Sequence, residues 1–326
     1  MFIPLGDDVD TRKFPAVGSI LIALCCVVYA FEHRLWVESR SRLPRFQLED
    51  LHSQVDEKAH AERVAAAVKM TPYYDFIDTW AVSPRNLRQG HFLSLVSYMF
   101  LHGDFFHLLG NMVVLWAFVG TLENALGPAG FLCMYLLWGV LAALAHLAFN
   151  WQADLPMIGA SGAISGMIGG YFIVFGALTH IRVLVWFIVP LGRYHIPAGA
   201  FVLIWICTQL HGLDQAQQYG IDDVAWYAHL GGFAAGTLTM LFMRREIRSR
   251  MYRDAYGVWQ IRDVSPTPDT EAVKELPAEE LPSRTEVPPG MPVCPDCGTE
   301  LSDKNKIHDF LLRCPNPKCQ KLIYTQ

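Results

Sequence analysis

The sequence predicts an all-α polytopic membrane protein with six transmembrane helices, followed by a small zinc ribbon with four cysteine ligands. Three observations predict this class. Mean hydropathy is positive, at +0.23, and only 17% of the 326 residues are charged. Six apolar runs are long enough for a bilayer core, which needs about 20 helical residues. Two close cysteine pairs stand near the C-terminal end. The net charge of −5 and the lack of a clustered basic stretch do not favour nucleic-acid binding.

The apolar runs also predict how the chain is oriented. The predicted spans are 15–31, 104–122, 129–149, 157–178, 183–210 and 225–243. The first follows Arg12 and Lys13, but no small-x-small cleavage site follows it, which favours a retained span over a signal peptide. Basic residues that follow the last span directly are Arg244, Arg245, Arg248, Arg250 and Arg253. Because short basic flanks stay in the cytoplasm, six spans place both termini there.

The segments outside the spans differ in composition. Residues 1–14 are the expected cytoplasmic N-terminus, and 15–245 the membrane domain. Within it, 32–91 forms a long outside loop, in which 46–70 has the rhythm of an amphipathic helix on the membrane surface. Residues 246–292 are expected to hold a cytoplasmic helix end and a disordered linker rich in Pro and Glu.

The last segment, 293–326, carries the cysteine pairs. Sixteen residues separate Cys294 and Cys297 from Cys314 and Cys319, a spacing typical of tetrahedral zinc coordination by thiolates. Two disulfides are the alternative, which the reducing cytoplasm disfavours. We expect a structural zinc here, which supplies folding energy or builds a surface for a cytoplasmic partner. The segment has too few lysines to indicate nucleic-acid binding.

Four polar side chains lie at a similar depth in three of the predicted spans. His107 and Asn111 lie in the second span, Ser161 in the fourth and His229 in the sixth. At 1.5 Å per residue, all four fall within about 6–12 Å of the outer ends of their helices. Polar groups inside a membrane are energetically costly, so each is a functional candidate. Each alone also has a plain packing explanation, and the shared depth favours a common site.

Small residues predict which of these helices touch. The glycines of the fourth and sixth spans stand on helical faces, at Gly162, Gly166, Gly170, Gly232 and Gly236. Such small-xxx-small faces let helix backbones approach closely in lipid. Ser161 adjoins one face and His229 lies on the other. Packing the two faces together would bring these side chains within reach of each other.

The four residue types suit attack on a peptide carbonyl. A serine hydroxyl needs a neighbouring base, and neutral histidine is the usual one near pH 7. The oxyanion that forms needs donors in place, and His107 and Asn111 are spaced i and i+4 to converge on one point. The backbone N–H of Ser161, in the first turn of its helix, is a third candidate donor.

Three motifs follow one another along the chain: H102-G-D-F-F-H107-L-L-G-N111, G159-A-S161-G162 and A228-H229-L-G-G232-F-A-A-G236. In these motifs and in their order, the chain resembles the rhomboid family of intramembrane serine proteases. The resemblance implies a rhomboid-like six-helix bundle with a water-filled cavity open to the outside. It also implies a Ser161–His229 dyad with no third acid and an oxyanion hole at His107 and Asn111. No catalytic cofactor is implied.

The resemblance also implies partners and a location. Its usual substrates are single-pass transmembrane proteins, cut near the outer ends of their helices at small residues, so the partners are these substrates and the lipid bilayer. We expect the inner membrane of a bacterium as the location. His102 matches a structural family histidine, and Glu123 a position associated with hydrogen bonding at a helix end.

Three positions depart from the family pattern. Ser165 stands where bacterial members often carry Tyr or Phe against the catalytic histidine, and Gly90-His91-Phe92-Leu93 keeps only the glycine of Gly-x-Trp-Arg. A glycine expected before Ala228 is not evident. The main rival function is a catalytically inactive rhomboid-like adaptor that binds transmembrane helices, which would be expected to lack the serine or histidine. A transporter would need deeper charges or broken helices. A metalloprotease would need a His-Glu-x-x-His motif.

Overall fold

A computed structural model describes most of the first 261 residues and three short strands near the end. The described residues are 2–9, 13–42, 69–152, 156–185, 192–219, 224–253, 259–261, 306–308, 311–313 and 322–324. The chain divides into two compact units, Met1–Val264 and Ser265–Gln326. The predicted amphipathic helix at 46–70, the linker residues 262–292 and the four paired cysteines lie outside, or almost wholly outside, the described residues.

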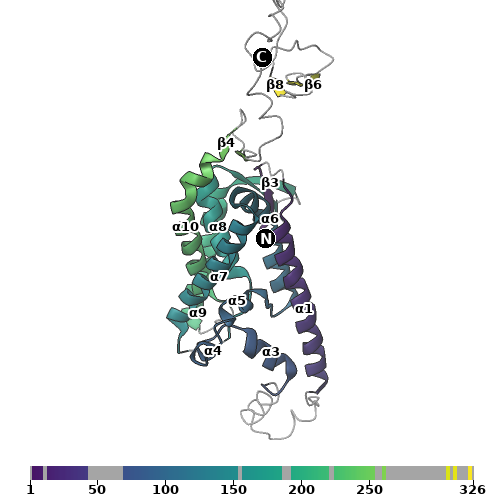
Figure 1. Cartoon of the computed structure of the whole chain (residues 1–326), viewed down its shortest axis with the longest axis vertical. Helices are drawn as coiled ribbons and strands as arrows, with labels where there is room; N and C mark the ends of the chain where they lie inside the picture. The colour runs from purple at the N-terminus through teal and green to yellow at the C-terminus, as the bar shows by residue number, and fades with distance from the viewer. Residues whose placement is uncertain are drawn as a thin grey trace, which may run out of the picture. The chain divides into compact units, whose positions relative to one another are not determined.

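Helices dominate the first unit (Figure 1). The long ones are α1 (Ala16–Arg42), α6 (Phe105–Leu126), α7 (Pro128–Asn150), α8 (Ser161–Phe175), α9 (Ala198–Tyr219) and α10 (Trp226–Ser249). Shorter ones lie between α1 and α6: α3 (Pro72–Trp80), α4 (Pro84–Arg88), α5 (Ser94–Ser97) and the 3-10 turn η2 (Tyr98–Phe100). The buried faces of the long and short helices form one continuous apolar core, which includes Trp138, Tyr98, Phe118 and Tyr171.

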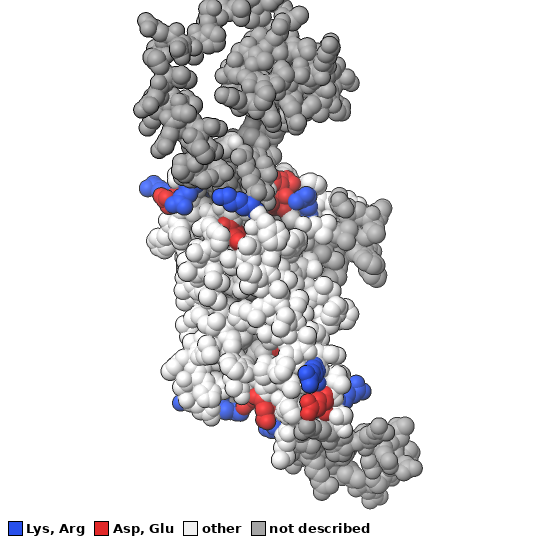
Figure 2. Space-filling model, turned by 45° about the vertical axis from the view of Figure 1, so that its right-hand side comes forward, with Lys and Arg blue, Asp and Glu red and all other residues white. Residues whose placement is uncertain are grey.

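Several helices have the character of membrane spans. Among the described residues, Ala16–Ser41, Phe105–Leu126 and Pro128–Asn150 are long and apolar enough to cross a bilayer, and α8 is a shorter apolar helix. On the face shown in Figure 2, Lys, Arg, Asp and Glu gather toward two ends of the first unit, with a largely uncharged zone between them. The helices and the charge distribution suit an integral membrane protein. Within the described ranges, helices in three of the six predicted spans are long and apolar enough to cross a bilayer.

The fifth predicted span, 183–210, is wrong at its start. Residues His180–Val185 form strand β2, and Gly192–Pro197 form β3. β2 pairs antiparallel with β3 on one side and on the other with β1 (Phe2–Asp7), in the order β1-β2-β3. A short apolar run rich in β-branched residues suits a strand as well as a helix. The helix begins only after Pro197, and it continues to Tyr219 into residues that were predicted as a loop between the fifth and sixth spans, 211–224.

Close packing of α8 against α10 positions the two elements that carry Ser161 and His229. A methyl group added at Gly232 would collide with the carbonyl oxygen of Gly162, and one at Gly236 with that of Gly166. The predicted contact of the two glycine faces is therefore confirmed. Trp138 of α7 covers this junction and donates from Nε1 to Thr239 Oγ1 at 2.9 Å.

Replacing Gly236 by alanine is expected to destabilise the bundle by about 1–3 kcal/mol, the usual cost of overpacking. The added methyl group would push α10 away from the backbone of α8. Thermal unfolding in detergent measures the loss. Gly110→Ala in α6 is the matched control, because among the described residues no atom beyond its chain neighbours and its own helix backbone lies within 4 Å of the added methyl group. An equal midpoint for Gly236→Ala and the unaltered protein would contradict the close contact.

Buried polar groups fix the helix ends. Glu123 of α6 accepts from the backbone N–H groups of Val17 and Gly18, at 3.1 and 2.9 Å, and so caps the first turn of α1. The predicted helix-end role of Glu123 is therefore confirmed. At the C-terminal end of α8, Arg248 of α10 donates to the carbonyl oxygens of Ile173 and Val174. This arginine was predicted only as a topology signal.

Two further sheets follow α10 in the sequence. β4 (Met251–Arg253) pairs antiparallel with β5 (Trp259–Ile261), a hairpin between the end of α10 and the predicted linker at 262–292 that the sequence did not predict. Trp259 anchors this hairpin by donating from Nε1 to the carbonyl oxygen of Phe175 at 2.9 Å. In the second unit, β6 (Lys306–His308), β7 (Leu311–Arg313) and β8 (Leu322–Tyr324) form an antiparallel sheet in that order.

Candidate active site

Ser161 is the first residue of α8. The chain enters the helix through Gly159, whose φ of +119° disfavours any residue with a side chain. The N–H of Gly159 is held by the carbonyl oxygen of Tyr98 at 2.9 Å. A helix start leaves backbone N–H groups unbonded and carries partial positive charge, so Ser161 stands where an anion is favoured.

His229 of α10 meets Ser161 directly. Its Nε2 lies 2.8 Å from Ser161 Oγ, although 68 residues separate the two in sequence. The glycine contacts between α8 and α10 allow this short distance. The indole of Trp226 lies edge-on to the imidazole, with ring centroids 6.0 Å apart.

Gln209 of α9 holds the other side of the imidazole. Its Oε1 lies 2.8 Å from His229 Nδ1. Its amide nitrogen donates to the Trp205 carbonyl oxygen at 3.2 Å and to Thr208 Oγ1 at 3.1 Å. With its NH₂ group engaged there, the oxygen faces His229, so Nδ1 carries the proton and Nε2 is free to accept from Ser161. Sequence reasoning missed this residue, although a glutamine inside an apolar span was a signal.

His107 and Asn111 lie next to Gly159, two residues before Ser161 in the chain. A methyl group at Gly159 would stand 2.7 Å from His107 Nε2 and 3.6 Å from Asn111 Nδ2. Asn111 is 8% exposed, and its Nδ2 has no hydrogen-bond partner among the described residues. A buried donor without an acceptor is energetically costly, so this amide is suited to a group that arrives from outside the protein.

The start of α6 sets the direction of these donors. Asp104 is the N-cap and accepts from the backbone N–H groups of Phe106 and His107, at 2.8 and 3.0 Å. The ring of His102 packs edge-on against that of His107, with centroids 5.2 Å apart. The turn before α6 therefore fixes both the backbone and the ring of His107.

A cavity of about 590 Å³ joins these groups. The four sequence-predicted residues line it together with Gln209, and so do the apolar side chains of Val114, Ile164, Ile168, Phe201 and Trp205. Ser165 also lines it, but its hydroxyl donates to the Ser161 carbonyl oxygen at 2.7 Å. Ser165 therefore binds its own helix and not His229.

The arrangement has the parts of a hydrolytic site built from side chains alone. It offers a hydroxyl hydrogen-bonded to a base, a base oriented by a second hydrogen bond, and further donors beside Gly159 in the same cavity. Within the described ranges, no group of three or more His, Cys, Asp or Glu is placed to hold a metal ion.

Comparison with known proteins matches the part of the chain that carries this site. Residues 89–246 match the Rhomboid domain family. The chain is 30% identical over 173 residues to Rhomboid protein 1, mitochondrial, of Saccharomyces cerevisiae, which covers 51% of this chain and 47% of that protein. It is 35% identical over 82 residues to Putative rhomboid protease YdcA of Bacillus subtilis, covering 25% of this chain and 41% of that protein.

A third relative matches a longer part of the chain at lower identity. The chain is 27% identical over 187 residues to Rhomboid-like protease 5 of Toxoplasma gondii, which covers 57% of this chain and 20% of that protein. The matched segments span about half or less of the length of these curated relatives.

Proposed function

We propose that this chain is an intramembrane serine endopeptidase. The premise is that the domain match and the relatives support the rhomboid family for this chain. The observation that carries the proposal is the 2.8 Å contact between Ser161 Oγ and His229 Nε2 inside a cavity of the membrane domain. Its substrates are transmembrane segments of other membrane proteins, cut near the outer face.

The reaction proceeds in two halves. Ser161 Oγ attacks the scissile carbonyl carbon while its proton passes to His229 Nε2. The tetrahedral oxyanion is held by Asn111 Nδ2 and the His107 ring N–H. The C–N bond then breaks as His229 returns the proton to the leaving amine. In the second half, water attacks the acyl ester with His229 as base, and Ser161 regains its proton.

The shape of the cavity supports a transmembrane substrate. Its walls combine the polar groups of the site with the apolar side chains of Phe201, Trp205 and Ile168. The polar part of the cavity accommodates water and an extended peptide backbone. The apolar part of the cavity accommodates a hydrophobic segment that leaves the lipid. The first unit has the apolar helices and charge bands of a membrane protein, so substrate and site share one bilayer.

Gln209 is proposed as a positioning residue for His229. Gln209→Leu is expected to lower kcat by about 10- to 100-fold, the size of one lost hydrogen bond to a group that becomes charged in the reaction. KM should change little, because Gln209 orients the base and not the bulk of the substrate. Cleavage of a single-span substrate in liposomes measures both constants.

Two further variants separate positioning from plain packing. Gln209→Glu keeps an acceptor facing Nδ1 and should restore most of kcat. Gln217→Leu removes an exposed glutamine of the same helix, which bonds Tyr227, and should leave kcat unchanged. If Gln209→Glu were as slow as Gln209→Leu, the positioning role would be wrong.

The cysteine-bearing segment is proposed to bind one structural zinc through Cys294, Cys297, Cys314 and Cys319. Four thiolates in two close pairs are a complete tetrahedral donor set, which supports the proposal. Metal analysis of the full chain is expected to give about one zinc per chain. The double variant Cys294→Ser/Cys297→Ser should lose the metal while cleavage persists. Disulfides at these positions would contradict both the metal and the proposed cytoplasmic location of both termini.

The membrane compartment stays a prediction. The relatives named above include a mitochondrial protein as well as a bacterial one.

A further inference from the structure

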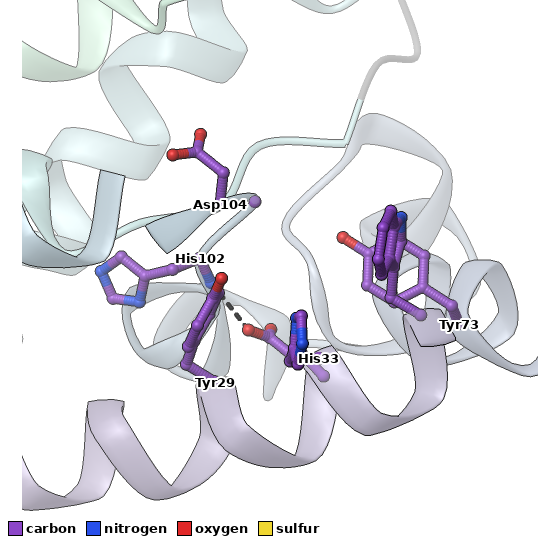
Figure 3. A pocket seen from close by; sticks show the side chains of 8 residues that line it. Tyr29, His33, Tyr73, His102 and Asp104 are labelled. Atoms are coloured by element: carbon purple, nitrogen blue, oxygen red, sulfur yellow. Dashed lines mark hydrogen bonds between the residues drawn. The ribbon is translucent and has the colours of Figure 1, made fainter. Parts of the chain in front are cut away.

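A second cavity, of about 250 Å³, lies between α1, α3 and the turn before α6 (Figure 3). Among the described residues, only Asp104 is shared between its lining and that of the candidate active site. Its volume is several times the roughly 30 Å³ that one water occupies in the liquid, so it can hold a larger group.

Aromatic rings form much of its wall. Tyr29, His33 and Trp36 follow one another on α1 at i, i+4 and i+7, which places them on one helical face. Their rings stack in sequence, with centroid distances of 6.1 Å from Tyr29 to His33 and 5.7 Å from His33 to Trp36. Tyr73 of α3 also lines the space (Figure 3). Ring faces of this kind attract cations.

A buried carboxylate stands beside these rings. Glu32 is 1% exposed, and its Oε2 accepts from the backbone N–H of His102 at 3.1 Å. Its Oε1 has no hydrogen-bond partner within the part of the chain that the structure describes. Because a buried carboxylate oxygen without a donor is costly, the cavity favours a ligand that supplies N–H groups and positive charge.

The remaining polar groups agree with a cationic ligand. Asp104 adds a second carboxylate, and among the described residues neither Lys nor Arg lines the cavity. Burial lowers the pKa of His102 to about 4, so its ring is neutral at pH 7. A bare metal ion fits poorly, since no set of three metal-ligating side chains is assembled in the described residues. Aromatic walls with a carboxylate suit an organic ammonium group.

Arg40 suggests what the ammonium group is attached to. Its guanidinium lies over the ring of Trp36, 5.3 Å from the centroid, one turn of α1 beyond the cavity wall. Guanidinium groups bind phosphate well. Tyr and Trp with a nearby Arg at the end of an apolar helix are also typical of the membrane–water interface, where lipid headgroups lie.

We propose that this cavity binds the headgroup of a zwitterionic phospholipid of the phosphatidylethanolamine type. The ammonium group lies between the rings and Glu32, and the phosphate lies against Arg40. A small soluble amine shares the ammonium chemistry but has no phosphate for Arg40.

Native mass spectrometry of the delipidated full chain tests the proposal, in a Ser161→Ala background so that the readout is independent of cleavage. Dioleoyl phosphatidylethanolamine and dioleoyl phosphatidylglycerol are offered at equal concentration. We expect about tenfold preference for the ethanolamine lipid, the size of one desolvated contact of an ammonium group. Acetylating the amine of the lipid should remove the preference.

Variants locate the binding to the cavity. Glu32→Gln keeps an acceptor for His102 but loses the charge, and it should remove the preference, whereas Glu38→Gln on the exposed side of the same helix should keep it. Trp36→Leu changes a side chain that is 42% exposed, so it tests the site without endangering the fold, and it should weaken the preference.

Three outcomes would overturn the proposal. The first is equal retention of the two lipids, and the second is a preference that persists in both Glu32→Gln and Trp36→Leu. The third is displacement of the lipid by free ethanolamine at the same concentration, which would make a soluble amine the ligand.

Discussion

Ser161→Ala and His229→Ala are each expected to abolish cleavage of a single-span substrate, with a loss of at least about 10³-fold. Removing Ser161 deletes the nucleophile, and removing His229 deletes the group 2.8 Å away that takes its proton. Because the two act as one unit, the double variant should be no slower than either single one. The measurement is the initial rate of cleavage by purified protein in liposomes.

Controls must separate chemistry from folding. Alanine at 161 removes one oxygen at a helix start and leaves the glycine contacts of α8 intact, so its unfolding midpoint should match that of the unaltered protein. Ser165→Ala is the matched serine control, because the hydroxyl of Ser165 bonds only its own helix in the described contacts. Its rate should stay within about threefold. Cleavage that survives in Ser161→Ala would exclude the proposed nucleophile.

Asn111→Ala is expected to lower kcat by about 10²- to 10³-fold, as the loss of one oxyanion-hole donor typically does. Its Nδ2 is buried without an acceptor in the described structure, beside Gly159 and in the cavity that Ser161 and His229 also line. That donor gains a partner only when the oxyanion forms, so the loss should fall on kcat and not on KM.

Asn124→Ala provides the control on the same helix. That amide bonds the carbonyl oxygens of Lys13 and Gly120 at the other end of α6, so its removal should leave kcat unchanged. His107→Ala should resemble Asn111→Ala in kcat. An unaltered kcat in both His107→Ala and Asn111→Ala would remove the oxyanion hole from the mechanism.

Much of the candidate site could be predicted, because its residues lie on helices whose glycine spacing indicates how they pack. The glycines of α8 and α10 indicated which backbones touch, and helix rise indicated the depth of Ser161 and His229. Glu123 followed from a family position and caps α1 as expected.

Gln209 escaped prediction because the boundaries of its helix were wrong. The fifth span was placed at 183–210, whereas α9 runs from Ala198 to Tyr219. Gly212, where α9 meets the ring of Trp226 in α10, therefore fell in a predicted loop. The glutamine inside an apolar span was a signal of function, but without a glycine contact assigned to this helix it did not indicate that α9 approaches His229.

Strands β1 and β2 could not be predicted for a related reason. The apolar run that starts at 183 has no periodicity that separates a strand from a buried helix, and its partner β1 is about 180 residues away in the sequence. The cavity around Glu32 could not be predicted either, because the contact of Glu32 with His102 joins two segments 70 residues apart.

Labelling with a fluorophosphonate, which reacts covalently with base-activated serines, tests the central claim most directly. Peptide mass spectrometry of the labelled full chain should find the adduct on Ser161, and His229→Ala should lose it while remaining folded. An adduct on another serine, or equal labelling of Ser161 without His229, would contradict the claim that His229 activates Ser161 for catalysis.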